Sequence, residues 1–263
     1  MTHSERVALM GCQIDNLTME ETLARVGEFI ADGRPHQHVV VNVDKLVKAA
    51  RDAPLRQIIN ECALVNVDGM PVVWASRLLG RPLKERVAGV DLFDALMHRA
   101  AVRGWRVFLL GAEESVVQEV HRRYAERLPA LQFAGVRNGY WTADEEEAVV
   151  EQVAASRADL LFVAISSPKK ERFLGRHQQR MRVPFAMGVG GSFDVAAGKV
   201  QRAPRWMQLS GLEWFFRFLQ EPRRMARRYF VEDMAFLPML WREWRAVRAT
   251  RSAAPATAPG ATR

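Results

Sequence analysis

Short runs of β-branched and aliphatic residues alternate with longer amphipathic stretches over the first two hundred residues of the chain. This alternation is typical of a parallel sheet in which each strand is followed by a covering helix. It is clearest over 106–127, where the apolar run RVFLL ends at Gly111 and an amphipathic segment follows. The predicted strands are His38–Val43, Ala63–Val67, Arg106–Leu110, Leu160–Ile165 and Phe185–Val189. The predicted helices are Lys45–Arg51, Pro71–Leu79, Asp91–Arg103, Glu113–Arg127, Ala143–Ser156 and Pro168–Met181.

The pattern predicts an α/β domain over residues 1–200, built on an open, Rossmann-like, mostly parallel sheet with helices on both faces. The chain has 263 residues, of which 49% are hydrophobic and 26% are charged, so it is long enough to bury a full core. Ligands of open α/β sheets bind at the carboxyl ends of the strands. Functional residues are therefore expected in the loops that follow the strands.

The composition changes beyond residue 200, where Arg and aromatic residues become frequent. Between Arg202 and Arg251, eleven Arg stand against five acidic residues, so this stretch carries +6 of the net charge of +8. Arg mixed with Trp and Phe is typical of a membrane interface. We expect a basic, aromatic, helical appendage over 201–250, with helical pieces near 212–219 and 222–230. The low-complexity segment 251–263 is expected to be a disordered tail.

The sequence shows no pattern of a segment that enters or crosses a membrane. Residues 1–21 lack the basic start and apolar stretch of a signal peptide. The longest uncharged run, 183–193, is far shorter than the roughly 20 apolar residues that span a bilayer. The two cysteines, Cys12 and Cys62, are expected to be reduced thiols in a cytosolic compartment. If the chain meets a membrane, we expect it to lie on the surface.

Two polar residues follow predicted strands near the start of the chain. Asp68 comes directly after a buried run and before a glycine, where a carboxylate could accept the proton of an attacking hydroxyl group. The alternative is that Asp68 caps the next helix, and position alone favours this alternative by roughly two to one. Asn42, at the end of the run HVVVN, has the same two interpretations.

A glycine-rich turn follows the last predicted strand. Gly188, Gly190 and Gly191 allow the backbone to approach a ligand closely and present N–H groups to an anion. The turn is not a dinucleotide-binding motif, because the third glycine of that motif would fall at Phe193. It is not a Walker loop either, since the required Lys and Ser/Thr spacing is absent. Taken alone, such a turn is explained by packing at least as often as by ligand binding.

Arg217, Arg224 and Arg227 are candidates for stabilising a departing diphosphate, which needs either a metal or cationic side chains. The sequence has no D-x-D or clustered His/Asp pattern, so we expect no metal site. The alternative is a basic face turned to solvent or lipid, and the residues alone leave the two interpretations equal. Lys169 and Lys170, in SPKKERF, could face a phosphate, but solvent exposure is the favoured interpretation.

Together these segments resemble the WecG/TagA/CpsF family of bacterial glycosyltransferases. The resemblance runs from about residue 42 to residue 228. Its most specific part is GVGGSFDVAAGKVQRAPRWMQ followed by GLEWFFRFLQEPRR, which matches the family in order and spacing. The resemblance implies an inverting, metal-independent transferase without a cofactor. Such an enzyme uses a UDP-sugar donor and a polyprenyl-diphosphate-linked sugar acceptor at the cytoplasmic face of the inner membrane.

The resemblance also assigns roles to residues. Asp68 becomes the catalytic base and Asn42 the family's active-site Asn, while Val40 replaces the Thr that usually precedes it. The family motif P-K-Q-E-x-W appears with Lys170 for Gln and Phe173 for Trp. Residues of the appendage are implied to close over the donor diphosphate and to dock on the membrane. The implied UDP-sugar-binding residues are Gly188, Gly190, Gly191, Ser192, Asp194, Lys170, Arg217, Arg224 and Arg227.

Family members differ in the sugar that they transfer. The segments VVVNVDKL and SPKKERF resemble most closely the glucosyltransferases of xanthan-type gum synthesis, which implies UDP-glucose and a role in exopolysaccharide synthesis. N-acetylmannosaminyl transfer is the alternative. The net positive charge indicates an anionic partner without identifying it, and the resemblance implies lipid and UDP rather than nucleic acid. Self-association is left open.

Two hypotheses from other classes compete with a transferase. A nucleotide-dependent oxidoreductase would share the α/β sheet, but it should carry the dinucleotide motif that Phe193 interrupts. A membrane-docked scaffold without catalysis would explain the basic, aromatic appendage. It gives no reason for a glycine-rich turn at a strand end.

Overall fold

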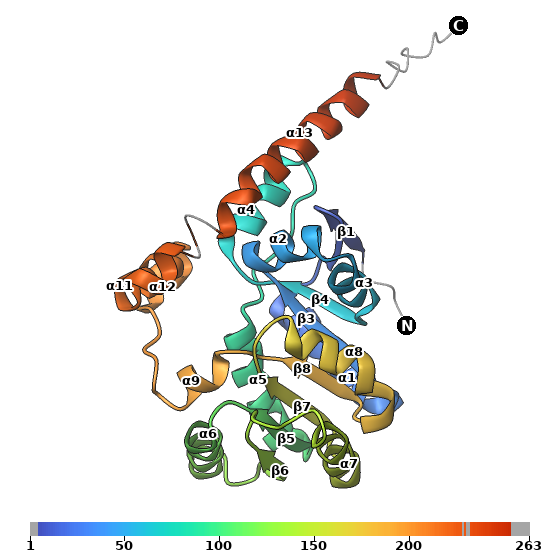
Figure 1. Cartoon of the computed structure of the whole chain (residues 1–263), viewed down its shortest axis with the longest axis vertical. Coiled ribbons are helices and arrows are strands. Elements are labelled where there is room, and N and C mark those ends of the chain that lie inside the picture. Colours follow the sequence, from blue (N-terminus) through green and yellow to red (C-terminus); the bar gives the residue numbers. More distant parts are fainter. Residues whose placement is uncertain (1–4, 228, 230–231, 254–263) are drawn as a thin grey trace, which may run out of the picture.

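The computed structural model describes residues 5–227, 229 and 232–253, and its centre is a six-stranded parallel sheet (Figure 1). The strand order is β4-β3-β8-β7-β5-β6, and every neighbouring pair is parallel. The strands are β3 (His36–Val41), β4 (Leu64–Val67), β5 (Arg106–Gly111), β6 (Gln132–Arg137), β7 (Leu160–Ala164) and β8 (Phe185–Gly188). The prediction of an open, Rossmann-like α/β sheet is therefore confirmed.

Both faces of the sheet are covered by helices, as predicted. Successive side chains of a strand point to opposite faces, so Leu160 and Phe162 of β7 enter one hydrophobic cluster and Leu161 and Val163 enter another. The first face is covered by α1 (Met19–Asp32), α5 (Gly89–Arg103), α6 (Glu114–Arg127) and α9 (Ser192–Ala196). The second is covered by α2 (Val43–Arg51), α3 (Ala53–Glu61), α7 (Glu146–Ser156) and α8 (Lys169–Met181).

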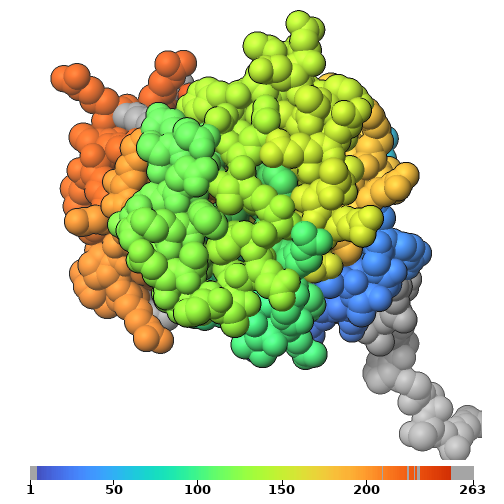
Figure 2. All heavy atoms as spheres, turned by 90° about the horizontal axis from the view of Figure 1, so that it is seen from below, coloured from blue at the N-terminus to red at the C-terminus, as the bar shows by residue number. Residues whose placement is uncertain are grey.

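The two edges of the sheet differ. At the β4 edge, an antiparallel hairpin of β1 (Arg6–Leu9) and β2 (Cys12–Asp15) packs alongside. The buried carboxylate of Asp15 accepts a hydrogen bond from the backbone N–H of Val65, at 2.8 Å, and so satisfies a donor of this edge strand. At the opposite edge lies β6. In the space-filling view from below, the middle of the chain, drawn in green, covers this end of the molecule (Figure 2).

Several elements were not predicted from the sequence. The hairpin turns at Met10 and Gly11, both of which have positive φ angles, and its strands are only four residues long. The helix α1 begins with a capping box between Thr18 and Glu21. The short helix α3 starts at Ala53, one residue before a proline. The strand β6 has no fully buried residue, so its sequence lacks the apolar run that marks the others.

The chain beyond α9 forms the predicted helical appendage. Its elements are α10 (Arg205–Leu209), α11 (Glu213–Gln220), α12 (Pro222–Arg227), the short 3₁₀ helix η2 (Asp233–Ala235) and α13 (Phe236–Ala253). Figure 1 shows α11 and α12 beside the sheet, whereas α13 returns over the core and then extends away from it. None of the described helices combines the length and the apolar character needed to cross a bilayer.

The first half of α13 is attached to the core, so the appendage is not a free arm. Phe236 is buried in the cluster that α2, α3 and α4 (Met70–Leu78) share with the hairpin. Glu243 accepts hydrogen bonds from the backbone N–H of Met10, at 2.7 Å, and from the guanidinium of Arg81, at 3.2 Å. The helix continues to Ala253, and the rest of the predicted disordered tail, 254–263, lies outside the described residues.

The close pairing of the ends of β5 and β7 gives a test of this architecture. Gly111 has φ +131°, and a β-carbon there would lie 2.6 Å from backbone atoms of Ala164. We expect Gly111→Ala to lower the free energy of unfolding by about 3 kcal/mol or more, because strain and steric overlap add. Gly33→Ala is the matched control, since Gly33 also has a positive φ, +70°, but open space around it. The control should lose only about 1–2 kcal/mol in urea unfolding, and equal losses would refute the close contact between Gly111 and Ala164.

Candidate functional site

The predicted site residues gather at the carboxyl edge of the sheet. Because all six strands are parallel, the loops after them line one edge, where ligands of open α/β sheets bind. Asp68 follows β4, Asn42 follows the neighbouring β3, and the glycine-rich turn follows β8, the next strand along. Residues far apart in the sequence are thereby placed in one row.

Asp68 is held at the start of α5 and does not cap the helix that follows it. Its backbone N–H donates to the carbonyl of Val41, at 2.8 Å, and its Oδ2 accepts from the N–H of Gly89, at 3.3 Å. The cap position of α4 is Gly69, with no side-chain hydrogen bond. The capping interpretation, which position alone favoured, is therefore wrong for α4. Burial raises the pKa of the Asp68 carboxyl above its ordinary value, despite the opposing charges of Arg86 and Arg217.

A compact group of charges surrounds Asp68. The guanidinium of Arg86 donates to Glu213 Oε2 at 3.0 Å, and Arg217 Nη2 donates to Glu213 Oε1 at 3.2 Å. Although burial raises it, the pKa of Glu213 is lowered overall by Arg217 and Arg86. Arg217 was predicted from the sequence as a site residue, but Arg86 and Glu213 were not. Their pairing spans 127 positions, and no local motif marks it.

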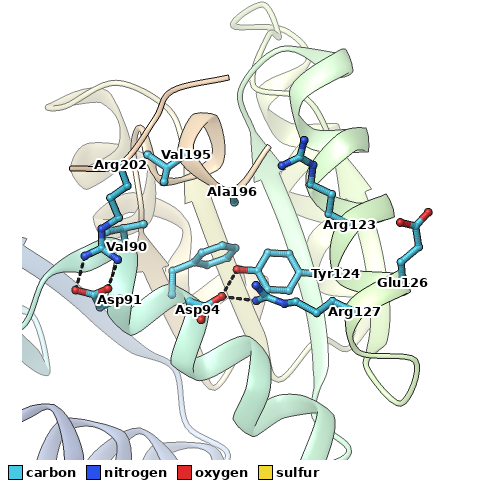
Figure 3. Close-up of a pocket in the computed structure, with 11 residues that line it drawn as sticks. Val90, Asp91, Asp94, Arg123, Tyr124, Glu126, Arg127, Val195, Ala196 and Arg202 are labelled. Atoms are coloured by element: carbon cyan, nitrogen blue, oxygen red, sulfur yellow. Dashed lines mark hydrogen bonds and ion pairs between the residues drawn. The ribbon is translucent and has the colours of Figure 1, made fainter. Parts of the chain in front are cut away.

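A second ion pair fixes the segment between α9 and α10. Arg202 contacts both carboxylate oxygens of Asp91, with Nη2 and Oδ2 at 2.6 Å (Figure 3). The pair lines a hollow of about 650 Å³ between α5, α6 and α9. Also along the hollow, Asp94 accepts from the Tyr124 hydroxyl at 2.7 Å and from Arg127. The charge of Arg202 also contributes to lowering the pKa of Glu213, so this end of the hollow adjoins the charges around Asp68.

Asn42 caps the helix α2, one of the two roles that its position at the end of a strand predicted. Its side-chain oxygen accepts the N–H of Lys45 at 2.9 Å and so caps α2. A β-carbon at Gly69 would lie 3.9 Å from the β-carbon of Asn42, so the two loops touch beside Asp68. Val40, which stands where the family usually has Thr, packs its methyl groups toward Gly89. The site therefore has an apolar side chain at position 40.

Lys170 lies directly under the glycine-rich turn. A β-carbon at Gly188 would lie 2.9 Å from Cδ of Lys170, and one at Gly190 would lie 3.4 Å from its Nζ. Any larger residue at position 188 would displace the Lys170 side chain, so packing against Lys170 favours glycine there. Lys170 itself is buried, which corrects the prediction that it is exposed. The reason is that α8 packs against strand β3, so this face of the helix is covered by the sheet and its loops.

Lys170 belongs to a buried group with one surplus positive charge. Glu171 Oε1 lies 2.7 Å from Nζ of Lys45 and 3.5 Å from Nζ of Lys170, and all three side chains are buried. Burial, with the nearby charge of Lys45, lowers the pKa of Lys170 to about 8, while Glu171 opposes the shift. One carboxylate thus serves two ammonium groups at the edge of the sheet. An anion bound at the turn would balance the surplus charge.

The rest of the turn is ordered by its own contacts. Ser192 is buried and its hydroxyl donates to the carbonyl of Val189 at 2.8 Å. Gly191 precedes α9, and Asp194 lies in the single turn and a half of that helix, half-buried. The carbonyl of Asp194 accepts the backbone N–H groups of Lys199 and Val200. These contacts hold the loop in one conformation, and Asp194 keeps its carboxylate beside Gly191.

A further cavity continues the same edge past β8. It has a volume of about 570 Å³ and lies beside the ends of β5, β6 and β7. Its wall includes Tyr140, Trp141 and Ser166, and Nζ of Lys169 lies 5.1 Å from the centre of the Trp141 ring. Aromatic rings and backbone polar groups in such a cavity suit a planar, hydrogen-bonding ring. The sequence analysis did not single out Tyr140 or Trp141, because β6 was not predicted.

Two of the three predicted arginines of the appendage can be placed, and they make different contacts. Arg217 lies in the charge group around Asp68. Arg227 is 80% exposed and its Nε lies 3.4 Å from Glu232 within the appendage. The side chain of Arg224 is outside the described part of the chain. Among the described residues there is no group of three or more His, Cys, Asp or Glu arranged to hold a metal ion.

Comparisons with known proteins agree with this geometry. The model of the family described as "Glycosyl transferase WecG/TagA/CpsF family" matches residues 7–250. A protein of Bacillus spizizenii is 35% identical over 72% of this chain and 73% of its own length. A protein of Bacillus subtilis is 34% identical over 74% and 75%, respectively. Both are named N-acetylglucosaminyldiphosphoundecaprenol N-acetyl-β-D-mannosaminyltransferase. The chain is a glycosyltransferase and belongs to the WecG/TagA/CpsF family.

Proposed function

We propose that this enzyme transfers a hexose from a UDP-sugar to a sugar carried on a polyprenyl diphosphate. The observation that carries the proposal is the environment of Asp68, whose carboxyl has a raised pKa and lies beside two guanidinium groups at the strand edge. A base with a raised pKa accepts a proton more readily, and nearby cations can stabilise a departing diphosphate. No other group of the described residues combines both properties at the carboxyl edge of the sheet.

The order of features along this edge suggests how the donor lies. The uracil ring occupies the aromatic cavity at the ends of β5, β6 and β7. The diphosphate then crosses the turn at Gly188–Gly191, where Lys170 supplies the positive charge that its neighbours leave unbalanced. The sugar points toward Asn42 and Asp68, at the ends of β3 and β4. Arg217 reaches the same region from the appendage.

The reaction is a single displacement at the anomeric carbon. The acceptor hydroxyl oxygen attacks this carbon and gives its proton to the Asp68 carboxylate as the new glycosidic bond forms. The bond from the anomeric carbon to the β-phosphate oxygen breaks, and UDP leaves with the electron pair. Lys170 and Arg217 stabilise the charge that develops on the departing diphosphate. One attack from the face opposite the leaving group inverts the anomeric centre.

The relatives suggest which sugars take part. Both are named for transferring N-acetyl-β-D-mannosamine to N-acetylglucosaminyl-diphospho-undecaprenol. We therefore propose N-acetylmannosamine as the transferred sugar and a lipid-linked N-acetylglucosamine as the acceptor. This replaces glucose and exopolysaccharide synthesis, which the relatives' names do not support. Glucose remains the second candidate, because Lys170 stands where the family pattern has Gln and lies against the proposed diphosphate position.

We further propose that the enzyme works at the cytoplasmic face of the inner membrane as a peripheral protein. The acceptor is anchored in the bilayer, so the site must approach the lipid surface. The described part of the appendage supplies exposed aromatic residues and arginines for this contact, including Trp206, Trp214 and Phe215. The lipid-linked acceptor and this exposed surface support the proposed peripheral binding. This binding needs no membrane-spanning anchor among the described helices.

The direct test is transfer to a lipid-linked N-acetylglucosamine with a panel of UDP-sugars. We expect UDP-N-acetylmannosamine to be used and Asp68→Asn to lower turnover about a hundredfold or more. The same substitution should not lower stability at neutral pH. A carboxyl whose folded pKa is raised stabilises the fold only at low pH and loses that contribution as the pH rises through the folded pKa.

Asp94→Asn is the matched control. Its pKa is lowered in the fold by Tyr124 and Arg127, although burial raises it, so at neutral pH this carboxylate stabilises the fold. The control should lose some stability in thermal unfolding and keep its turnover. Wild-type turnover in Asp68→Asn would remove Asp68 as the base. No transfer from any UDP-sugar would remove the proposed function.

Lys170 makes donor binding depend on pH. Because its pKa is about 8, the ammonium group loses its charge as the pH rises through this value. Calorimetric titration with UDP should therefore show an affinity that falls above pH 8. Lys170→Gln should bind UDP more weakly at pH 7 and lose this dependence. Lys84→Gln, at an exposed lysine paired with Glu21, should behave as wild type. An unchanged pH profile in Lys170→Gln would exclude contact with the diphosphate.

Arg217 is expected to act on both the base and the leaving group. Its charge opposes the rise in the pKa of Asp68, so Arg217→Gln should move the acid limb of kcat/KM to higher pH. The lost contact to the diphosphate should lower turnover by roughly tenfold or more in detergent. Arg217→Lys should restore the acid limb but only part of the turnover, since the fork geometry is missing. Arg242→Gln, exposed on α13, is the control, and equal effects in both variants would contradict the assignment.

A further inference from the structure

The helix α4 has an outer face that does not fit a purely structural role. Its inner face, which includes Val72, Val73 and Ala75, packs into the core. Its outer face carries Trp74, Arg77 and Leu78. These positions are spaced i, i+3 and i+4, so they share one side of the helix. Trp74 is 47% exposed and Leu78 is 58% exposed.

This face is continuous with the exposed apolar surface of the appendage. A β-carbon at Gly211, between α10 and α11, would lie 2.8 Å from Cγ of Met70 and 3.3 Å from Cζ2 of Trp74. The loop therefore rests directly on α4. On its two sides the appendage exposes further large apolar side chains, namely Trp206, Leu212, Trp214, Phe215 and Leu219. Two segments separated by more than a hundred residues thus form one apolar surface.

Because α4 starts close to Asp68, the apolar surface on its outer face lies near the proposed reaction centre. The helix begins at Met70, two residues after Asp68. At a rise of about 1.5 Å per residue, Trp74 and Leu78 lie roughly 6 and 12 Å further along its axis. A lipid surface on this face would hold a membrane-anchored diphosphate and its sugar at the entrance to Asp68. A soluble acceptor would give no reason to expose Trp and Leu at this point.

We propose that the outer face of α4 is a bilayer-docking surface of the catalytic domain itself, which enters the lipid interface together with α11. The charges identify the partner: Arg77 lies beside the apolar pair on α4, and Arg205 lies beside Trp206 in α10. Trp with Arg at an interface suits an anionic phospholipid surface. The inference rests on the proposed function only in that the acceptor is lipid-linked.

The natural cysteines make a direct experiment practicable. Cys12 and Cys62 are unpaired and buried, so a cysteine introduced at the surface can be labelled selectively. Leu78→Cys would carry an environment-sensitive fluorophore in the full chain. Val102→Cys is the matched control, because Val102 is 85% exposed near the end of α5, about 20 Å from that helix's start at the strand edge.

Vesicles of phosphatidylethanolamine and phosphatidylglycerol should shift the emission of the label at position 78 to the blue and leave the label at 102 unchanged. Trp74→Ser with Leu78→Ser should weaken vesicle sedimentation roughly tenfold. The double variant should keep wild-type transfer to a water-soluble short-chain acceptor. Phosphatidylglycerol should be required, and salt should weaken the binding.

Other outcomes would overturn either the inference or the proposed function, and they distinguish the two. An unchanged label at 78 on vesicles that bind the protein would place the docking surface on the appendage alone, with the proposed function intact. A blue shift that grows with protein concentration without vesicles would show that a second copy of the chain covers α4. A shift on vesicles without transfer from any UDP-sugar would keep the docking surface and remove the proposed function instead.

Discussion

Every charge at the carboxyl edge of this sheet needs a partner, because an isolated buried ion costs several kcal/mol. The edge is formed by buried strands and covered by α2, α5 and α8, so water cannot solvate ions there freely. Two groups result. Arg86 and Arg217 share Glu213 beside Asp68, and Lys45 and Lys170 share Glu171 beside the glycine-rich turn. Much of the local architecture follows from these shared carboxylates.

The two groups differ in their net charge, and this difference has a chemical consequence. Around Asp68 two guanidinium groups meet two carboxylates, so the group is neutral when Asp68 is ionised. Around Glu171 two ammonium groups meet one carboxylate, so a positive charge is left over. An anionic diphosphate at the turn completes the second group. Protonation of Asp68 leaves the first group, around Asp68, with one net positive charge. Both changes occur during the proposed transfer.

The sequence predicted the sheet and part of the site because the information for them is local. Asp68, Asn42 and the turn from Gly188 to Ser192 each directly follow an apolar run, and a run that ends at a polar or glycine residue can be recognised without knowing the fold. The central strands of the sheet can be recognised in the sequence for the same reason. The edge strand β6 and the hairpin β1–β2 were missed because their residues are only partly buried or their strands are short.

The partners of the site residues could not be predicted, because they depend on tertiary contacts. Arg86 is one of many arginines until Glu213 of the appendage is placed beside it. Lys170 was expected to be exposed, since a lysine at the start of a charged helix usually is. Only the packing of α8 against the strand β3, with Lys45 of α2 nearby, explains its burial. Sequence patterns thus predicted where the proposed chemistry lies along the chain, whereas the fold determines which charges lie beside it.

The helix α11 presents charges to the site on one side and exposed apolar side chains on another. Glu213 and Arg217, one turn apart, face the site and contact each other at 3.2 Å. Phe215 and Leu219, also one turn apart, are exposed on another side. A helix of eight residues is too short to be stable alone, so its position is set by what it contacts on each side. In the proposed docking, contact with a lipid surface on the outer side favours the same placement that holds Arg217 beside Asp68, and so couples membrane binding to assembly of the site.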